Sequence, residues 1–248
     1  MVSGIRGGSR LRSPPISPAL IPLALLCFLW CGGRTAPAQG RWVQLVWALQ
    51  SYTVFLREVQ SGDDPWRPAV RCLVSLQLYN WGPDQSFTMS HAEVPQYPTM
   101  AFRVWRNHRP IPSRKLGSDD YFTVSASSGE KVRISYEYVE QVLPADPAAK
   151  IDVFEDTWGF TGFRPPLEEL QVAVDLGPMY ADYRAFPAFG RNPAIPAYSY
   201  EEFFLRIFRV FPPGYRMRGR EVWWRIHNGA PHLTSASRLR IEWRAWYR

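Results

Sequence analysis

Three carboxylates lie close together in "KIDVFEDTWGF", residues 150–160: Asp152, Glu155 and Asp156, beside Trp158. Paired carboxylates near an aromatic ring can act as general acid and base on a sugar, and carboxylate oxygens can also hold Ca²⁺. The segment lacks the spaced Asp, Asn and Gly residues of a calcium-binding loop. Solvated turn residues are the simpler interpretation, so this acidic cluster is kept as an alternative site, that of an extracytoplasmic glycan hydrolase.

The four histidines offer little metal-binding chemistry. His91 lies close to Glu93 in the sequence and His227 lies close to His232, but zinc needs three or four converging ligands. The sequence contains no HExxH or CxxC motif. We therefore expect histidines at hairpin tips, and we predict no metal and no cofactor.

Motifs for nucleophilic catalysis and for nucleotide binding are also absent from the sequence. There is no G-x-S-x-G segment, and no glycine-rich loop opens a helix after a strand. Cys72 falls on the apolar side of a strand pattern, where a thiol behaves as a small hydrophobe of low reactivity. These absences favour a protein that is not an enzyme.

Aromatic residues are the one compositional excess, at 15% of the chain with 11 tryptophans. Neighbouring strand residues face opposite sides, so Trp223 and Trp224 must diverge, and Trp246 must point away from the side of Trp243. An outward tryptophan among arginines is stacked under arginine, packed against the other half of the chain, or exposed as a binding platform. The candidate ligand-binding residues are Trp223, Arg225, Arg244 and Trp246.

Alternation of apolar and polar residues is the main structural signal. In "AVRCLVSLQLYNWG" the apolar side consists of Val70, Cys72, Val74, Leu76 and Leu78. The same period of two recurs in "MAFRVW", "KVRISYEYV", "EVWWRIH" and "RLRIEWRAWYR", with turn-forming residues between them. The segment 41–60 fits a helix about as well as a strand with a phase break near Ser51, and we favour a strand from Ser51 to Val59. Half-buried antiparallel strands explain this pattern.

The predicted fold class is therefore mainly β, an antiparallel β-sandwich architecture with two immunoglobulin-like halves. The halves are 39–143 and 150–248, joined by the Pro/Ala-rich segment "LPADPAAK".

We expect at most one short helix, in the second half. Ser199 and Glu202 form a capping box before an apolar stripe that Pro212 and the two residues after it would end, although a strand fits these residues nearly as well. The region 177–197, rich in proline and aromatic residues, is expected to be a long ordered loop.

The N-terminal segment has the order of a signal peptide: arginines, then an apolar run from Ala19 to Cys31, then Ala36-Pro37-Ala38. The apolar run is short for a membrane-spanning helix, which needs about 20 residues. We predict cleavage after Ala38, so that residues 1–38 are lost and the mature chain begins at Gln39. An uncleaved anchor and a lipid on Cys31 remain alternatives, and only through this N-terminal segment would the chain be tied to a membrane.

Charge gives no sign of a nucleic-acid partner. The formal net charge of +7 falls to +3 when the four arginines of residues 1–38 are removed. The remaining basic residues are spread through strand-like segments, whereas a DNA-binding protein gathers them on one face. Nucleic-acid binding is therefore not expected.

Together these features predict a secreted or periplasmic binding or structural module of the cell envelope or exterior. Its partner would be a polysaccharide or an envelope protein, bound through outward aromatic residues. The glycan hydrolase is one alternative. A small outer-membrane β-barrel is another, because alternation also describes barrel strands, although the many prolines and the charged residues on most non-core faces weigh against it.

Overall fold

The computed structural model describes residues 42–58, 66–93, 97–142, 150–157, 169–186, 197–227 and 238–247, together with residues 144–146 and 148. All of them belong to one compact unit, Gly32–Arg248. The predicted signal peptide and its cleavage site lie outside these residues.

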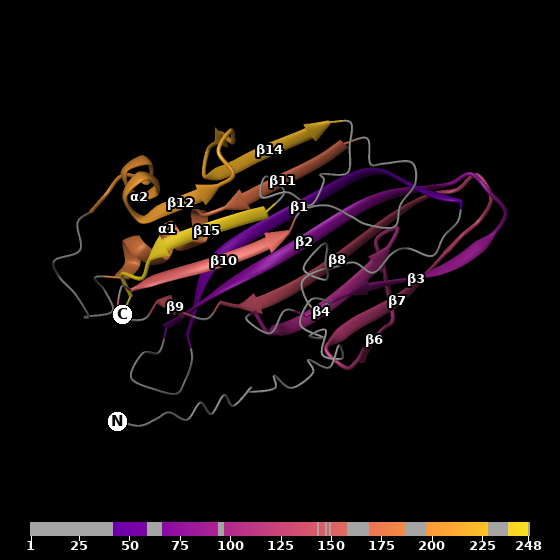
Figure 1. Cartoon of the computed structure of the whole chain (residues 1–248), viewed down its shortest axis with the longest axis horizontal. Coiled ribbons are helices and arrows are strands. Elements are labelled where there is room, and N and C mark those ends of the chain that lie inside the picture. Colours follow the sequence, from indigo (N-terminus) through magenta and orange to yellow (C-terminus); the bar gives the residue numbers. More distant parts are fainter. Residues whose placement is uncertain are drawn as a thin grey trace, which may run out of the picture. The chain divides into compact units, whose positions relative to one another are not determined.

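Strands dominate this part of the chain and confirm the mainly β prediction (Figure 1). The largest sheet has eight strands in the order β13-β14-β11-β1-β2-β8-β4-β5. Their bounds are β1 (Val43–Glu58), β2 (Trp66–Asn80), β4 (Thr99–Arg106), β5 (Arg109–Ile111), β8 (Lys131–Gln141), β11 (Glu169–Asp175), β13 (Arg216–Arg218) and β14 (Glu221–His227).

Two smaller sheets complete the strand structure. The four-stranded sheet has the order β12-β15-β10-β9, and the three-stranded sheet has the order β3-β7-β6. Their strands are β3 (Gln85–His91), β6 (Ser113–Leu116), β7 (Asp119–Ala126), β9 (Pro144–Asp146), β10 (Ile151–Thr157), β12 (Phe208–Phe211) and β15 (Arg238–Arg244).

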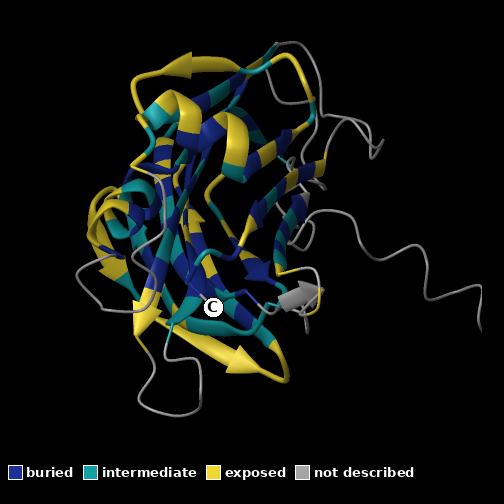
Figure 2. Cartoon of the chain, turned by 90° about the vertical axis from the view of Figure 1, so that its left-hand side faces the viewer, coloured by how far each residue is buried: buried dark blue, intermediate teal, exposed yellow. Residues whose placement is uncertain are grey.

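Both smaller sheets pack on the same face of the eight-stranded sheet. The rings of Tyr52 on β1 and Phe154 on β10 lie 5.9 Å apart, and those of Phe122 on β7 and Tyr136 on β8 lie 5.8 Å apart. We call the face that carries Tyr52 and Tyr136 the inner face, and the opposite one the outer face. The buried residues gather where the strands face one another (Figure 2).

The period-two pattern correctly predicted which residues enter this core. On β2, Cys72 is 1% exposed, and the other four apolar residues of the pattern are buried with it. The apolar positions predicted for β8 and β15 are buried as well. Because side chains alternate along a strand, this agreement fixes the phase of all three strands.

The phase break predicted near Ser51 lies elsewhere in β1. The pairing of β1 with β2 shifts between Leu45 and Trp47, where one extra residue bulges out of the strand. From Trp47 onward the strand keeps one register through Ser51 to Glu58. The segment is a single long strand, so the helical alternative is wrong.

The two predicted halves share one sheet. Strand β11, from the second half, pairs in parallel with β1, with Trp47 opposite Glu169 and Thr53 opposite Asp175. Strand β14 then adds to β11 in antiparallel orientation. Because this sheet crosses the expected linker at 143–150, the immunoglobulin-like detail of two separate sandwiches is not confirmed.

Helix α2 (Tyr200–Ile207) confirms the predicted capping box. The hydroxyl of Ser199 accepts a hydrogen bond from the backbone N–H of Glu202, and the carboxylate of Glu202 accepts one from the backbone N–H of Ser199. The expected end at Pro212 is wrong. The helix stops at Ile207 because the next four residues, β12, pair with β15.

A second helix, α1 (Gly177–Ala185), lies in the region predicted to be a long loop, so the expectation of at most one helix is wrong. Proline is compatible with this helix because Pro178 occupies its first turn, where a missing backbone N–H costs nothing. Asp182 fixes α1 to β1 by accepting a 3.1 Å hydrogen bond from the backbone N–H of Leu56. Neither α1 nor α2 is long and apolar enough to span a membrane.

Candidate functional site

The acidic cluster is part of a strand and is not a solvated turn. Along β10, Asp152 and Asp156 point into the core, at 0% and 5% exposure, whereas Glu155 points to the other side and pairs with Arg240. Asp156 accepts hydrogen bonds from the hydroxyls of two tyrosines of the inner face, at 2.9 Å from Tyr52 and 3.4 Å from Tyr138. Asp152 accepts one from Tyr247.

This geometry does not suit a pair of glycosidase acids. Four residues along a strand separate Asp152 and Asp156 by roughly 13 Å, whereas the two carboxyls of a glycosidase stand about 5–10 Å apart. Both carboxylates already bind phenol hydroxyls in the core, where a sugar has no access. Asp156 therefore connects the four-stranded sheet to the eight-stranded one, and Asp152 holds the segment that follows β15.

His91 lies in the core and His108 lies at a hairpin tip. His91 is 1% exposed and stacks on the rings of Tyr138, at 4.0 Å, and Phe102, at 5.6 Å. His108 occupies the β4–β5 turn with a φ of 66°, which confirms a hairpin-tip position for this residue. His227 is the last residue of β14, and His232 lies outside the described residues. Within the described ranges, no three His, Cys, Asp or Glu side chains are placed to hold a metal ion.

Trp246 is packed against the helices. Its ring meets Tyr183 of α1 at 5.6 Å, Phe203 of α2 at 5.5 Å and Tyr247 at 5.1 Å, each edge-to-face. Such aromatic pairs stabilise a fold beyond the area they bury. Arg244 is exposed at the end of β15. Trp246 is therefore a packing residue and does not form a platform.

Trp223 lies on the outer face, and Trp224 lies on the inner one. Trp224 is 7% exposed and donates a 3.1 Å hydrogen bond to the carbonyl oxygen of Pro212. Trp223 is half-buried, and its indole N–H donates to a carboxylate oxygen of Glu221 at 2.8 Å. Strand pairing places Arg216 of β13 directly opposite Trp223, with its side chain on the same face.

The guanidinium of Arg225 is held beside Trp223 by a two-bond contact with Glu169 on β11. Nε lies 3.0 Å from Oε1 and Nη2 lies 2.9 Å from Oε2. This contact raises the pKa of Arg225, and its fork geometry fixes the plane of the guanidinium. Gln171 of β11 also donates to Glu169. Arg225 and Gln171 thus lie one row from the indole ring along the outer face, and Glu169 lies one row further.

The outer face continues beyond this point across the central strands. Register places Ala173, Ser51 and Leu73 in one row with Trp223, and places Gln171 and Leu49 in the next row with Arg225. Leu73 is 36% exposed. Ala173 is 3% exposed, so a ligand lying across the strands would meet an indole, two leucine side chains, a hydroxyl, an amide and a guanidinium.

The structure brings together only two of the four candidate residues. Trp223 and Arg225 share the outer face. Arg244 instead ends β15 of the four-stranded sheet, which packs on the inner face, and Trp246 lies in the turn after β15. Their neighbours Arg216, Gln171 and Glu169 were missed by the sequence argument. Alternation within "RMRGREVWWRIH" predicts the face of Arg216, but only tertiary structure shows that β11 lies beside β14.

No family model matches this chain, and no curated protein matches it either. Among solved structures, a "putative nutrient binding protein" of Legionella pneumophila is 11% identical with a TM-score of 0.56, over 85% of this chain and 70% of that one. An M1 zinc metallopeptidase of Deinococcus radiodurans is 12% identical with a TM-score of 0.41, over 84% of this chain. This chain covers 44% of the length of the metallopeptidase. At such identities the likeness to the Legionella protein is one of fold alone.

Proposed function

We infer that this chain is an exported, non-catalytic binding module of the cell envelope or exterior, and that it holds a polysaccharide on its outer face around Trp223. The observation that carries this function is the half-exposed indole of Trp223 beside a guanidinium that Glu169 already holds in place. The C–H face of a sugar ring packs on an indole, while its hydroxyls need ordered donors and acceptors. An indole ring and ordered polar groups share the outer face here.

The composition of the outer face favours a glycan over an envelope protein as the partner. The cores of protein interfaces are depleted of charged residues and rich in aromatic ones. Around Trp223 the face instead carries Arg216, Gln171, Ser51 and the ion pair of Arg225. Hydroxyl-rich ligands match this mixture.

The inward position of Asp152 and Asp156 supports a non-catalytic role, since these carboxylates serve the core. For the finer fold, we infer a sandwich-like arrangement in which the two small sheets cover the inner face and leave the outer face for ligand. Export rests on the signal-like sequence of residues 1–38.

Co-sedimentation of the mature chain with insoluble peptidoglycan, chitin and cellulose tests this function. We expect binding to at least one of them, and a loss of roughly tenfold or more in affinity for Trp223→Ala, as for a central anchor residue. Trp81→Ala is the matched control, because Trp81 is 49% exposed but lies in the turn after β2, edge-on to Trp42.

Both variants should show a cooperative unfolding transition in denaturant, as the unchanged protein does. If none of the three glycans is bound, or if Trp223→Ala binds as well as Trp81→Ala does, the outer face is not a glycan site. Capture of an envelope protein in place of a glycan would also overturn the proposal.

A further inference from the structure

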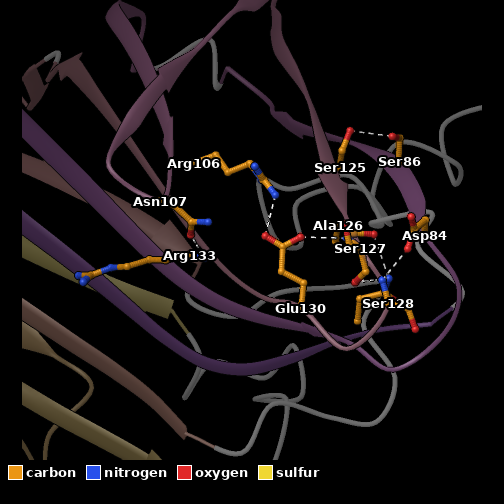
Figure 3. A network of polar contacts seen from close by, with 11 residues as sticks. Asp84, Ser86, Arg106, Asn107, Ser125, Ala126, Ser127, Ser128, Glu130 and Arg133 are labelled. Carbon is orange, nitrogen blue, oxygen red and sulfur yellow. Dashed lines mark hydrogen bonds and ion pairs between the residues drawn. The ribbon is translucent and has the colours of Figure 1, made fainter.

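A polar hollow of about 340 Å³ lies at one end of β3 and β7, away from Trp223. Its walls come from the start of β3, the end of β7, the last residue of β4 and the turn that leads into β8 (Figure 3). The polar lining consists of Asp84, Gln85, Ser86, Arg106, Ser125 and Ser127.

A buried asparagine holds the two walls together. Asn80 is 1% exposed, and its side-chain N–H groups reach the carbonyl oxygens of Pro83, Ala126 and Ser127 at 2.8–3.0 Å. Its carbonyl oxygen accepts from the side chain of Gln85 at 2.7 Å. Because Asn80 bonds to both walls, the hollow is preformed.

Two carboxylates order the turn at the rim. Glu130 binds Nη2 of Arg106 at 2.7 Å through one oxygen and the backbone N–H of Ser127 at 2.9 Å through the other. Asp84 accepts from the backbone N–H of Ser128 at 2.7 Å through Oδ1. These contacts fix the positions of Arg106 and Asp84 without using all of their polar atoms (Figure 3).

The groups that remain suit a small hydroxyl-bearing molecule. Nε of Arg106 is buried and closed to solvent, so it offers no donor to a ligand in the hollow. The hydroxyls of Ser86 and Ser125 lie 2.8 Å apart on adjacent strands, and each retains capacity for a further bond. Asp84 has two carboxylate oxygens that can accept from ligand hydroxyls.

Charge decides between classes of ligand. Glu130 neutralises Arg106, which leaves Asp84 as the net charge of the hollow. An anion would be repelled by Asp84, and a divalent cation needs more oxygen ligands than one carboxylate supplies. A neutral molecule that both donates and accepts hydrogen bonds is not repelled by Asp84 and does not need further oxygen ligands.

We propose that this hollow is a binding site for one neutral sugar ring, with a pair of neighbouring hydroxyls donating to the carboxylate of Asp84. Ser86 and Ser125 contact a third hydroxyl. The volume lies at the lower end of the range for small-molecule sites, roughly 300–1,000 Å³. The site is separate from the outer face around Trp223 and does not depend on it.

Amide chemical shifts of the folded mature chain, titrated with D-glucose, D-mannose and N-acetyl-D-glucosamine, test this site. We expect weak binding by at least one sugar, with shifts at Ser86, Arg106, Ser125 and Ser127. The double variant Ser86→Ala/Ser125→Ala should weaken the affinity about two- to tenfold for each lost hydrogen bond. The matched control is Thr88→Val/Thr123→Val, the next outward pair along the same two strands.

No shift at the hollow with any of the three sugars would overturn the proposal. So would equal affinities for the serine variant and its control, or shifts produced by sodium acetate in place of the sugars. Trp223→Ala should leave the shifts at the hollow unchanged. The Trp223→Ala variant therefore tests the outer-face function, and the Ser86→Ala/Ser125→Ala variant tests the hollow.

Discussion

The hydroxyl of Tyr52 donates a 2.9 Å hydrogen bond to Oδ2 of Asp156, joining the eight-stranded sheet to the four-stranded one between residues 104 positions apart. Both groups are buried, so if one of them is removed, water cannot easily take its place as the hydrogen-bond partner of the other. A buried carboxylate that loses one of its donors has less to offset the cost of its desolvation. This contact therefore contributes more to the free energy of unfolding than the predicted position of Asp156 in a solvated turn suggested.

Tyr52→Phe should lower the free energy of unfolding by about 1–3 kcal/mol, because it removes the shorter of the two tyrosine hydrogen bonds to Asp156. Equilibrium unfolding in urea measures the change. Tyr79→Phe, on the half-buried end of β2, serves as control and should change stability by less than about 0.5 kcal/mol. Equal effects of the two changes would mean that the Tyr52 hydroxyl does not bind Asp156 in solution.

Trp246→Ala and Trp223→Ala should differ in stability, although sequence alone treats the two tryptophans alike. Trp246 contacts three aromatic rings, so its removal should cost roughly 3 kcal/mol, the lower end for buried large aromatics. Trp223 lies half-exposed on the open outer face, and its removal should cost about 1 kcal/mol or less. Denaturant midpoints of the two variants rank them. The reverse order would place Trp246 at the surface.

The thiol of Cys72 should resist a thiol reagent in the native state, because the residue is 1% exposed on the inner face. Labelling should become complete when denaturant is added. Ser118→Cys, in the exposed β6–β7 turn, provides a thiol in the same chain that should react at once. Native labelling of Cys72 at a comparable rate would contradict the register of β2.

Stability should fall as pH rises through the titration of Asp182. Burial raises the pKa of this carboxyl above its ordinary value of 3.8, although its hydrogen bond from Leu56 opposes the shift. The folded state then binds a proton more tightly than the unfolded state does, so the stabilisation is complete below 3.8 and is lost as pH rises through the folded-state pKa.

Asp182→Asn should therefore raise the melting temperature at pH 7 relative to the native chain, and this advantage should shrink toward pH 3.5. Thermal unfolding across this pH range measures the difference between the two proteins. An advantage that grows on acidification would show that the folded-state pKa of Asp182 is lowered, which is the opposite of the expected direction.

Local patterns in the sequence predicted those parts of the fold that depend on local chemistry. The phase of Cys72 followed from alternation along β2, and the start of α2 followed from the reciprocal hydrogen bonds of Ser199 and Glu202. Helix α1 was missed because Pro178 was taken as a loop residue, although a proline in the first turn is compatible with a helix.

Long-range pairing was beyond sequence reasoning. Asp152 and Asp156 were placed on a surface turn because carboxylates favour water, and their donors Tyr247 and Tyr52 lie about 100 residues away in the chain. Likewise, nothing local to Arg225 points to Glu169, and nothing local to Arg106 points to Asp84. Alternation along β14 did predict that Trp223 and Arg225 share one face, because that depends only on their spacing in the strand.

The parallel contact between β1 and β11 also sets an order of events during synthesis. Until residues 169–175 have left the ribosome, β1 has a partner on only one side, and the backbone groups along Trp47–Thr53 remain open to any passing strand. A nascent chain that pauses before this point exposes an adhesive edge in the middle of its future sheet. Whether such a chain aggregates then depends on how soon residues 169–175 are synthesised and pair with β1.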